Sequence, residues 1–151
     1  MTISLHPISI TNLEAILALK VSEAQQSFVA SNAYSIAQAA YYEESCARAI
    51  CRDDQPVGFI MLYDETQREV EPRKPEIAIE RLMVDQQFQG QGIGREVLKM
   101  VIEQVRARNQ FKELFLSYTP GNDGGEKLYR EVGFVPTGEE IDGEILMSYK
   151  F

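Results

Sequence analysis

The sequence is poor in the side chains that build metal centres and disulfides. Its 151 residues include two cysteines, one histidine and no tryptophan. Cys46 and Cys51 lie on one predicted strand, an odd number of positions apart, so they face opposite sides and do not bridge each other. His6 is interpreted as a surface residue of another strand. We therefore expect no disulfide, no metal site and no cysteine nucleophile activated by a histidine.

Long apolar runs and an excess of positive charge are also missing. No stretch approaches the roughly 18 apolar residues of a membrane-spanning helix, and the N-terminus lacks the basic and apolar regions of a secretory signal. Acidic residues outnumber basic ones, 23 to 15, which gives a net charge of −8. The sequence therefore argues against membrane and nucleic-acid partners and predicts a cytoplasmic protein. Its negative field suits a cationic ligand.

Length and hydrophobic patterning predict one domain over residues 1–151. Strands are predicted over 2–9, 47–52, 57–63, 77–84, 111–118, 134–139 and 144–151, the last two joined by a tight Asp142-Gly143 turn. Helices are predicted over 11–23, 35–42 and 126–132, and from a glycine loop to Arg108; capping boxes at Thr11/Glu14 and Ser35/Gln38 open the first two. The strands 77–84 and 111–118 flank a helix, so they should be parallel. The charged tract 64–75 is predicted to be a mobile surface loop.

The chain is organised around a strand, a glycine loop and a long helix between Ile77 and Arg108. The loop Gln89-Gly-Gln-Gly-Ile-Gly94 lets backbone amides turn to one side, next to a helix N-terminus, and so favours an anion such as phosphate. Arg95 and Glu96 stand where a Walker loop has Lys-Ser/Thr, and Arg95 also replaces the third glycine of a dinucleotide fingerprint. The loop therefore predicts a phosphate cradle of another type; a glycine-rich turn without a ligand is the alternative.

A second motif, Asn122-x-x-Gly125-x-x-Leu128-Tyr129-x-x-x-Gly133-Phe134, follows about thirty residues later. With Gln89-x-x-Gly92-x-Gly94 it resembles the GCN5-related N-acetyltransferases (GNAT) across nearly the whole chain. Gly125 departs from the family, where alanine is more usual. The resemblance implies an α/β (α+β) fold with a mixed, mostly antiparallel sheet of about seven strands, about four flanking helices and a splayed parallel strand pair. It also implies acetyl-CoA as cosubstrate.

The residues expected to bind acetyl-CoA come from both motifs. Amides near Met83 and Val84 would hold the pantetheine and the thioester oxygen, and the glycine loop would hold the pyrophosphate. Arg95 is predicted either to contact phosphate or to be a solvated helix residue. The full set is Leu82, Met83, Val84, Gln89, Gly90, Gln91, Gly92, Ile93, Gly94, Arg95, Asn122, Lys127 and Tyr129.

Two side chains are candidates for the chemistry. Glu80, two residues from Leu82 on the central strand, should share its face and act as the base that deprotonates an amine, or bind the substrate. Its alternative is a structural ion pair with Arg81. Tyr129 corresponds to the family's general acid and is expected to donate a hydrogen bond to the leaving sulfur. The alternative for Tyr129 is a core tyrosine beside Leu128.

The N-terminal half is similar to that of bacterial spermine/spermidine acetyltransferases, through Gln25-x-x-Phe28-Val29 and Ser35-Ile-Ala-Gln-Ala39. The resemblance implies a polyamine acceptor, direct acetyl transfer and a homodimer. The expected acceptor residues are Gln25, Phe28, Tyr34, Glu43, Glu44, Glu80 and Tyr118. Another amine acceptor (an amino acid, aminoglycoside or peptide N-terminus) and a non-catalytic CoA sensor remain open.

Overall fold

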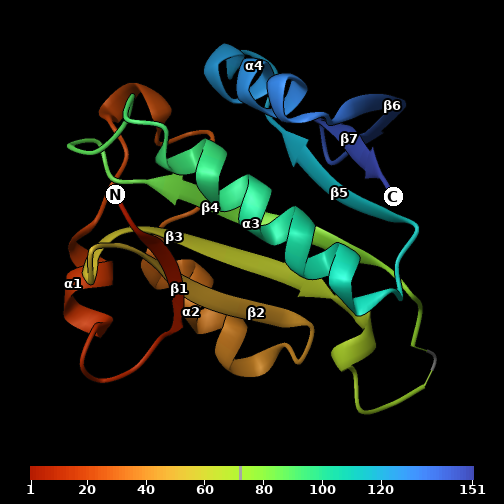
Figure 1. Ribbon diagram of the computed structural model, residues 1–151, viewed down its shortest axis with the longest axis horizontal. Coiled ribbons are helices and arrows are strands. Elements are labelled where there is room, and N and C mark those ends of the chain that lie inside the picture. Colours follow the sequence, from red (N-terminus) through yellow and green to blue (C-terminus); the bar gives the residue numbers. More distant parts are fainter. Residues whose placement is uncertain (72) are drawn as a thin grey trace.

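The computed structural model describes residues 1–71 and 73–151. Strands and α-helices follow in the predicted order, with two short 3₁₀ turns added (Figure 1). The strands are β1 (Ile3–Pro7), β2 (Ser45–Arg52), β3 (Gln55–Asp64), β4 (Ile77–Val84), β5 (Glu113–Tyr118), β6 (Val135–Ile141) and β7 (Glu144–Lys150). The helices are α1 (Leu13–Ala18), α2 (Asn32–Tyr41), α3 (Ile93–Arg108) and α4 (Asp123–Val132), and the 3₁₀ turns are η1 (Glu23–Gln25) and η2 (Glu65–Gln67).

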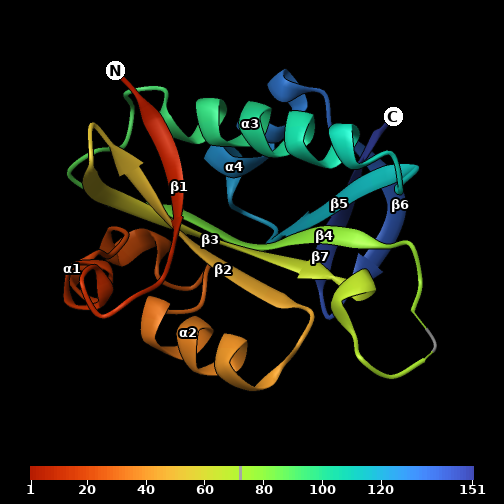
Figure 2. The ribbon, with the colours of Figure 1, turned by 60° about the horizontal axis from the view of Figure 1, so that its bottom comes forward.

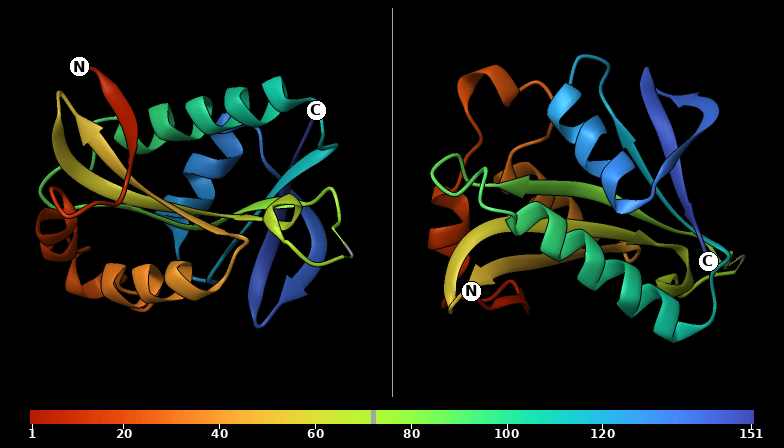
Figure 3. Two further views of the ribbon diagram at one scale, coloured as in Figure 1. Left: turned by 90° about the horizontal axis from the view of Figure 1, so that it is seen from below. Right: turned by 45° about the horizontal axis from the view of Figure 1, so that its top comes forward.

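The strands form one mixed sheet in the order β1-β2-β3-β4-β5-β7-β6. Neighbouring strands are antiparallel except β4 and β5, which are parallel as predicted. Figure 2 shows α3 and α4 on one face of the sheet and α1 and α2 on the other. Figure 3 shows β1 and the β6–β7 hairpin at the two opposite edges. The fold class expected from the sequence is confirmed.

Each face of the sheet has its own hydrophobic core. The larger core lies beneath α3 and includes the predicted stripe of Val97, Leu98, Val101, Ile102 and Val105. The smaller core, around Phe59 and Met61, lies beneath α1 and α2. Successive strand residues point to opposite faces, so the central strands contribute to both cores. Within the described residues, no helix is long and apolar enough to cross a membrane.

The first two helices begin or end elsewhere than predicted. The first ends at Ala18 instead of continuing to residue 23, because Lys20 leaves it to bond the loop after β4, its N–H donating to Asp85 Oδ1 at 2.9 Å. The second begins at Asn32, where Ser31 Oγ accepts from the Tyr34 N–H. Ser35, the predicted cap, is a fully buried residue inside that helix. A tertiary contact therefore ends the first helix early, and an earlier local cap starts the second helix before the predicted one.

The described part of the tract 64–75 is more ordered than predicted at its start. Asp64 ends β3 and is almost fully buried, and Arg108 Nη1 donates to its Oδ2 at 2.7 Å. Glu65, also buried, accepts hydrogen bonds from Tyr63 Oη and Arg68 Nη1. Carboxylates are buried when such partners satisfy them. Pro72, which was included in the predicted loop, lies outside the described residues.

The two tight hairpin turns rest on left-handed backbone. Asp53 and Asp54, between β2 and β3, have φ values of 47° and 69°. Asp142 and Gly143, between β6 and β7, have φ values of 49° and 81°, which confirms the predicted primed turn. The second turn matters for the site because it fixes where β7 begins.

Candidate active site

A large pocket opens where β4 and β5 diverge. The register of this parallel pair covers Ala78↔Phe115 and Ile79↔Leu116, and the strands separate beyond it (Figure 1). The pocket has a volume of about 1210 Å³, above the usual range for one drug-sized ligand. Its lining comes from residues 21, 25–30, 79–84, 88–90, 92–95, 116–119, 121–125, 127–129, 131 and 144. Both predicted motifs therefore meet in one cavity.

The glycine loop forms an open anion cradle at one end of the pocket. Gly90 and Gly92 have φ values of 77° and 83°, and a Cβ added to either would meet nothing within 4 Å. Gly92 is the N-cap of α3, so the first amides of a 16-residue helix face the same space. At Gly94 the lack of a side chain serves packing instead. A Cβ added there would lie 3.2 Å from a Leu128 methyl, so this glycine lets α3 and α4 pack closely.

Side chains on either side of the loop fix its position. Gln89 Nε2 donates to the Val84 carbonyl and to Gln25 Oε1, both at 2.9 Å, and Gln25 Nε2 donates back to Gln89 Oε1 at 3.2 Å. Gln91, predicted to bind the cofactor, lies outside the pocket lining, where Arg52 Nη1 donates to its Oε1. The loop is thus attached to η1 through one glutamine and to the end of β2 through the other.

The two basic candidates near the cradle differ. Arg95 lines the pocket but forms an ion pair with Glu131 of α4, with both side chains substantially exposed. Lys127, on α4, also lines the pocket, and its contact with the cofactor stays a prediction. Exposed ion pairs contribute little stability, about 0–1 kcal/mol, so the Glu131 pair is a weak competitor for an anionic ligand.

Helix α4 supplies the opposite wall. It begins three residues earlier than predicted because Asn122 is its N-cap, with Oδ1 accepting from the Gly125 N–H at 3.1 Å. A Cβ at Gly125 would lie 2.7 Å from Asn122 Nδ2. The glycine that departs from the family pattern therefore makes room for this cap.

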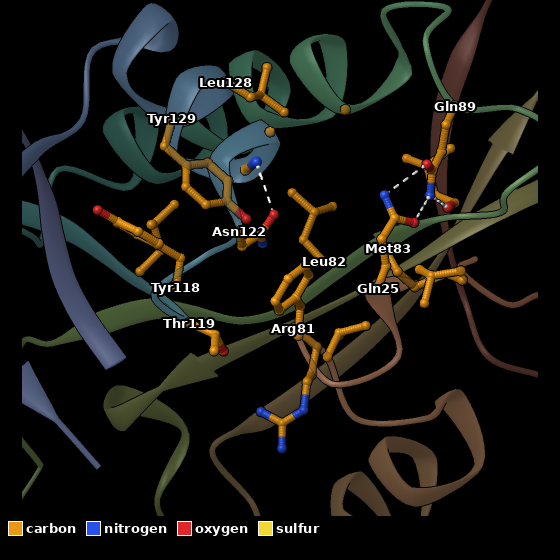
Figure 4. Close-up of a pocket in the computed structure, with 18 of the residues that line it drawn as sticks. Gln25, Arg81, Leu82, Met83, Gln89, Tyr118, Thr119, Asn122, Leu128 and Tyr129 are labelled. Carbon is orange, nitrogen blue, oxygen red and sulfur yellow. Dashed lines mark hydrogen bonds between the residues drawn. The ribbon is translucent and has the colours of Figure 1, made fainter. Parts of the chain in front are cut away.

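Two tyrosines, Tyr118 and Tyr129, lie on the same side of the pocket as Asn122, and their ring centroids are 6.5 Å apart. Burial, and then the nearby carboxylate of Glu144, raises the pKa of Tyr129 to about 12. Burial, and then Glu126, also raises the pKa of Tyr118, which belongs to the core beneath α3. Figure 4 shows both rings and Asn122 on one side of the pocket. Their hydroxyls thus stay protonated at neutral pH and can donate hydrogen bonds.

A β-bulge in β4 determines where Glu80 points. Met61 pairs with Arg81 and Leu62 pairs with Ile79, so Glu80 is the extra residue. The prediction that Glu80 and Leu82 share a face is wrong, because the bulge breaks the alternation between them. Leu82 packs against the core beneath α3.

Glu80 and Arg81 instead both point toward the face covered by α2. Ser45 Oγ donates to Glu80 Oε2 at 3.2 Å, and Arg81 Nη2 donates to Gln38 Oε1 of α2 at 3.2 Å. Arg81 Nη1 lies 3.8 Å from Glu80 Oε1, which makes the two residues an ion pair, and each side chain is about one-fifth exposed. Both line the pocket, so the carboxylate has a cation beside it and still faces the cavity.

The predicted acceptor residues divide into two groups. Gln25 and Phe28 line the pocket, and Figure 4 shows Gln25 beside Gln89 at the loop end. Glu80 and Tyr118 line it too. The other three, Tyr34, Glu43 and Glu44, lie outside its lining, and their contact with the acceptor stays a prediction. Tyr34 is 58% exposed on α2, Glu43 Oε2 accepts from the Glu69 N–H, and the Glu44 carbonyl accepts from the Asp64 N–H.

Comparison with known proteins agrees with this geometry. The model of the Acetyltransferase (GNAT) family matches residues 13–134. The chain belongs to this family. The spermine/spermidine N(1)-acetyltransferase of Bacillus subtilis (strain 168) is 26% identical over 148 residues, 97% of each chain. A probable spermine N(1)-acetyltransferase of B. subtilis subsp. natto has the same identity and coverage.

Solved structures share the GNAT fold at lower identity. The PaiA N-acetyltransferase of Thermoplasma acidophilum, in complex with coenzyme A, has a TM-score of 0.71 at 16% identity, and the match covers all of both chains. The aminoglycoside acetyltransferase AAC(6′)-Ib, in complex with coenzyme A and kanamycin, has a TM-score of 0.78 at 16% identity, over 99% of this chain and 95% of that one. Coenzyme A is thus a ligand of this fold in both.

Sequence reasoning missed an acidic residue of this GNAT pocket. Glu144, the first residue of β7, lines the pocket, and Ser117 Oγ of β5 donates to its Oε1 at 3.4 Å. The only local signal is the turn at Asp142-Gly143, which fixes the start of β7. The missing information is the register, in which Tyr118 pairs with Ile145 and so brings Glu144 to the pocket end of β5.

Proposed function

We propose that this GNAT protein transfers the acetyl group of acetyl-CoA directly to a primary amine of a small cationic acceptor, a polyamine such as spermidine or spermine. The observation that supports this best is the polarity of the pocket. An anion cradle of backbone amides lies at the α3 end, and carboxylates of Glu80 and Glu144 lie where β4 and β5 separate. The two Bacillus relatives, named for spermine or spermidine, support the same acceptor class.

The cofactor end fits acetyl-CoA. Gly90 and Gly92 leave open space beside the α3 amides, as a bulky pyrophosphate requires. The pantetheine arm would lie along the separated edge of β4, from Leu82 to Val84, with Asn122 opposite. Acetyl-CoA would supply an activated thioester, and the protein's part is to position its carbonyl and direct backbone amides at the oxygen.

Glu80 is proposed to remove the proton from the attacking amine. An alkyl ammonium with a pKa near 10.4 is almost fully protonated at pH 7, and freeing the base form costs about 4–5 kcal/mol. A carboxylate at hydrogen-bond distance, or one water away, reduces that cost. The Ser45 hydroxyl holds one carboxylate oxygen of Glu80 while the side chain faces the pocket.

Tyr129 is proposed to donate a hydrogen bond to the departing sulfur. Its pKa is raised to about 12, whereas a free thiol has a pKa near 8.5, so full proton transfer from the tyrosine would be uphill by roughly 5 kcal/mol. A hydrogen bond stabilises the developing thiolate without that cost. The thiolate can then take its proton from solvent.

The test combines binding and turnover. Calorimetry should show one acetyl-CoA site, and an assay for released thiol should show acetylation of spermidine and spermine in preference to amino acids, aminoglycosides and peptide N-termini. Turnover of another class alone would overturn the polyamine assignment but keep the acetyltransferase. Binding of acetyl-CoA without turnover of any amine would favour a sensor.

A further inference from the structure

Glu144 differs in its surroundings from two other carboxylates of the pocket, Glu80 and Glu131. Glu131 is paired with Arg95, and Glu80 has Arg81 beside it. Within the described residues, no lysine, arginine or histidine lies within 4.0 Å of the Glu144 carboxylate. Its carboxylate is half-buried, lines the pocket and accepts a long hydrogen bond from the Ser117 hydroxyl, which is a weak partner for a charged group. It therefore retains capacity for a cationic partner.

Strand geometry places this carboxylate on the face of the sheet opposite α3. Leu114, Leu116 and Tyr118 of β5 pack into the core beneath α3. Ser117 alternates with them, so its hydroxyl and the Glu144 carboxylate bound to it lie on the opposite face. This is also the face toward which the β4 bulge turns Glu80.

The gap between β4 and β5 separates the two carboxylates. The register Ile79↔Leu116 is followed by Glu80 on one strand and Ser117 on the other, at the point where the strands separate. Glu80 is held by Ser45 on the β2 side, and Glu144 is held by Ser117 on the β7 side. Glu80 and Glu144 thus lie on opposite sides of the opening between β4 and β5.

We propose that Glu144 binds the second cationic nitrogen of the acceptor while Glu80 receives the amine to be acetylated. The proposal rests on the proposed function and adds a residue that sets specificity. Glu144 would favour acceptors with two positive charges over monoamines. Its position near Tyr129, whose pKa it helps to raise, keeps the bound chain beside the reacting centre.

The experiment compares Glu144→Gln with the wild type on two acceptors, spermidine and butylamine. Butylamine has the same four-carbon arm as spermidine but no second charge. Losing a charge-assisted hydrogen bond should raise the KM for spermidine about 10- to 100-fold, with kcat for spermidine and both constants for butylamine nearly unchanged. Glu139→Gln, an equal charge change on exposed β6 outside the pocket, should leave all values unaltered. Glu144→Asp should recover part of the spermidine affinity.

The alternative outcomes are distinct. An unchanged preference for spermidine in Glu144→Gln, or an equal loss on both amines, would overturn the assignment of Glu144. Acetyl-CoA affinity and melting temperature, measured on the same samples, show whether an equal loss comes from misfolding, and Glu144→Asp repeats the comparison in a conservative variant. A wild type that binds acetyl-CoA but acetylates neither amine would instead overturn the proposed function, and this proposal with it.

Discussion

The two ends of the pocket are built in different ways. The proposed cofactor end uses mainly the main chain of the β4 edge, the loop into α3 and the start of α4. The proposed acceptor end uses side chains from the β4 bulge, β5 and β7, which are far apart in sequence. A site made of main-chain groups depends on backbone conformation and tolerates many side chains. A site made of side chains depends on which residue stands at each position and on the strand register that brings these residues together. The cofactor end should therefore respond to changes of backbone, and the acceptor end to changes of single functional groups.

The largest effect is expected from Glu80→Gln, which changes one functional group at the acceptor end. Loss of a general base should lower kcat/KM for the amine about 100-fold. The loss should be greatest at low pH, where less of the amine is free base, while acetyl-CoA affinity stays normal. Rate–pH profiles and calorimetry measure the two effects. A profile with the wild-type shape and height would remove Glu80 from the mechanism.

Gly92→Val tests the cofactor end through its backbone. The residue has φ of 83°, where a β-branched side chain costs about 1–3 kcal/mol, so the loop should leave its cradle conformation. The dissociation constant for acetyl-CoA should rise about 10- to 100-fold, with little change in the KM for the amine.

Gly138→Val is the matched control for strain. Gly138 has φ of 90° and open space around it, and it lies on β6 outside the pocket. Gly138→Val should lower the free energy of unfolding about as much as Gly92→Val does, yet bind acetyl-CoA with the wild-type dissociation constant. Similar losses of affinity in both variants would mean that strain, rather than the cradle, is responsible.

Tyr129→Phe lies between the two ends and should have a smaller effect. Loss of a hydrogen bond to the sulfur should lower kcat about 10-fold, with substrate KM values retained. Because the pKa of Tyr129 is raised to about 12, its hydroxyl is protonated throughout neutral and mildly alkaline pH, so the loss should be constant with pH. Tyr149→Phe, which removes the acceptor of an Arg106 hydrogen bond outside the pocket, is the control. Wild-type turnover in Tyr129→Phe would indicate a core tyrosine.

The smallest effect is expected from Gly125→Ala. Alanine stabilises a helix by up to about 1 kcal/mol relative to glycine. Here its Cβ would displace the Asn122 side chain, and losing that N-cap costs about the same. Denaturant unfolding should therefore show little net change. Gly124→Ala, with nothing within 4 Å, should show the full gain; an equal gain in both variants would mean that Asn122 does not stabilise α4 as a cap.

The difference between the ends also explains what could be read from the sequence. The order of elements, the buried stripe of α3 and the glycine loop follow from local periodicity and backbone preference. The Glu80 bulge is a mismatch between β3 and β4, and the position of Glu144 is a register between β5 and β7. Neither is a property of one segment, so local pattern could not predict them. Lys20 shows the same limit, since it is bonded to Asp85, which lies far away in the sequence.

The divergence of β4 and β5 has a mechanical consequence. Ladder hydrogen bonds join β1–β4 to β5–β7 along a short seam at Ala78↔Phe115 and Ile79↔Leu116, so the sheet is two blocks with a narrow joint. A ligand held by β4 on one side and α4 on the other would bridge these blocks. Bound acetyl-CoA would then restrict the motion of β5–β7 relative to β1–β4. Part of the intrinsic binding free energy would offset the conformational entropy lost by this restriction.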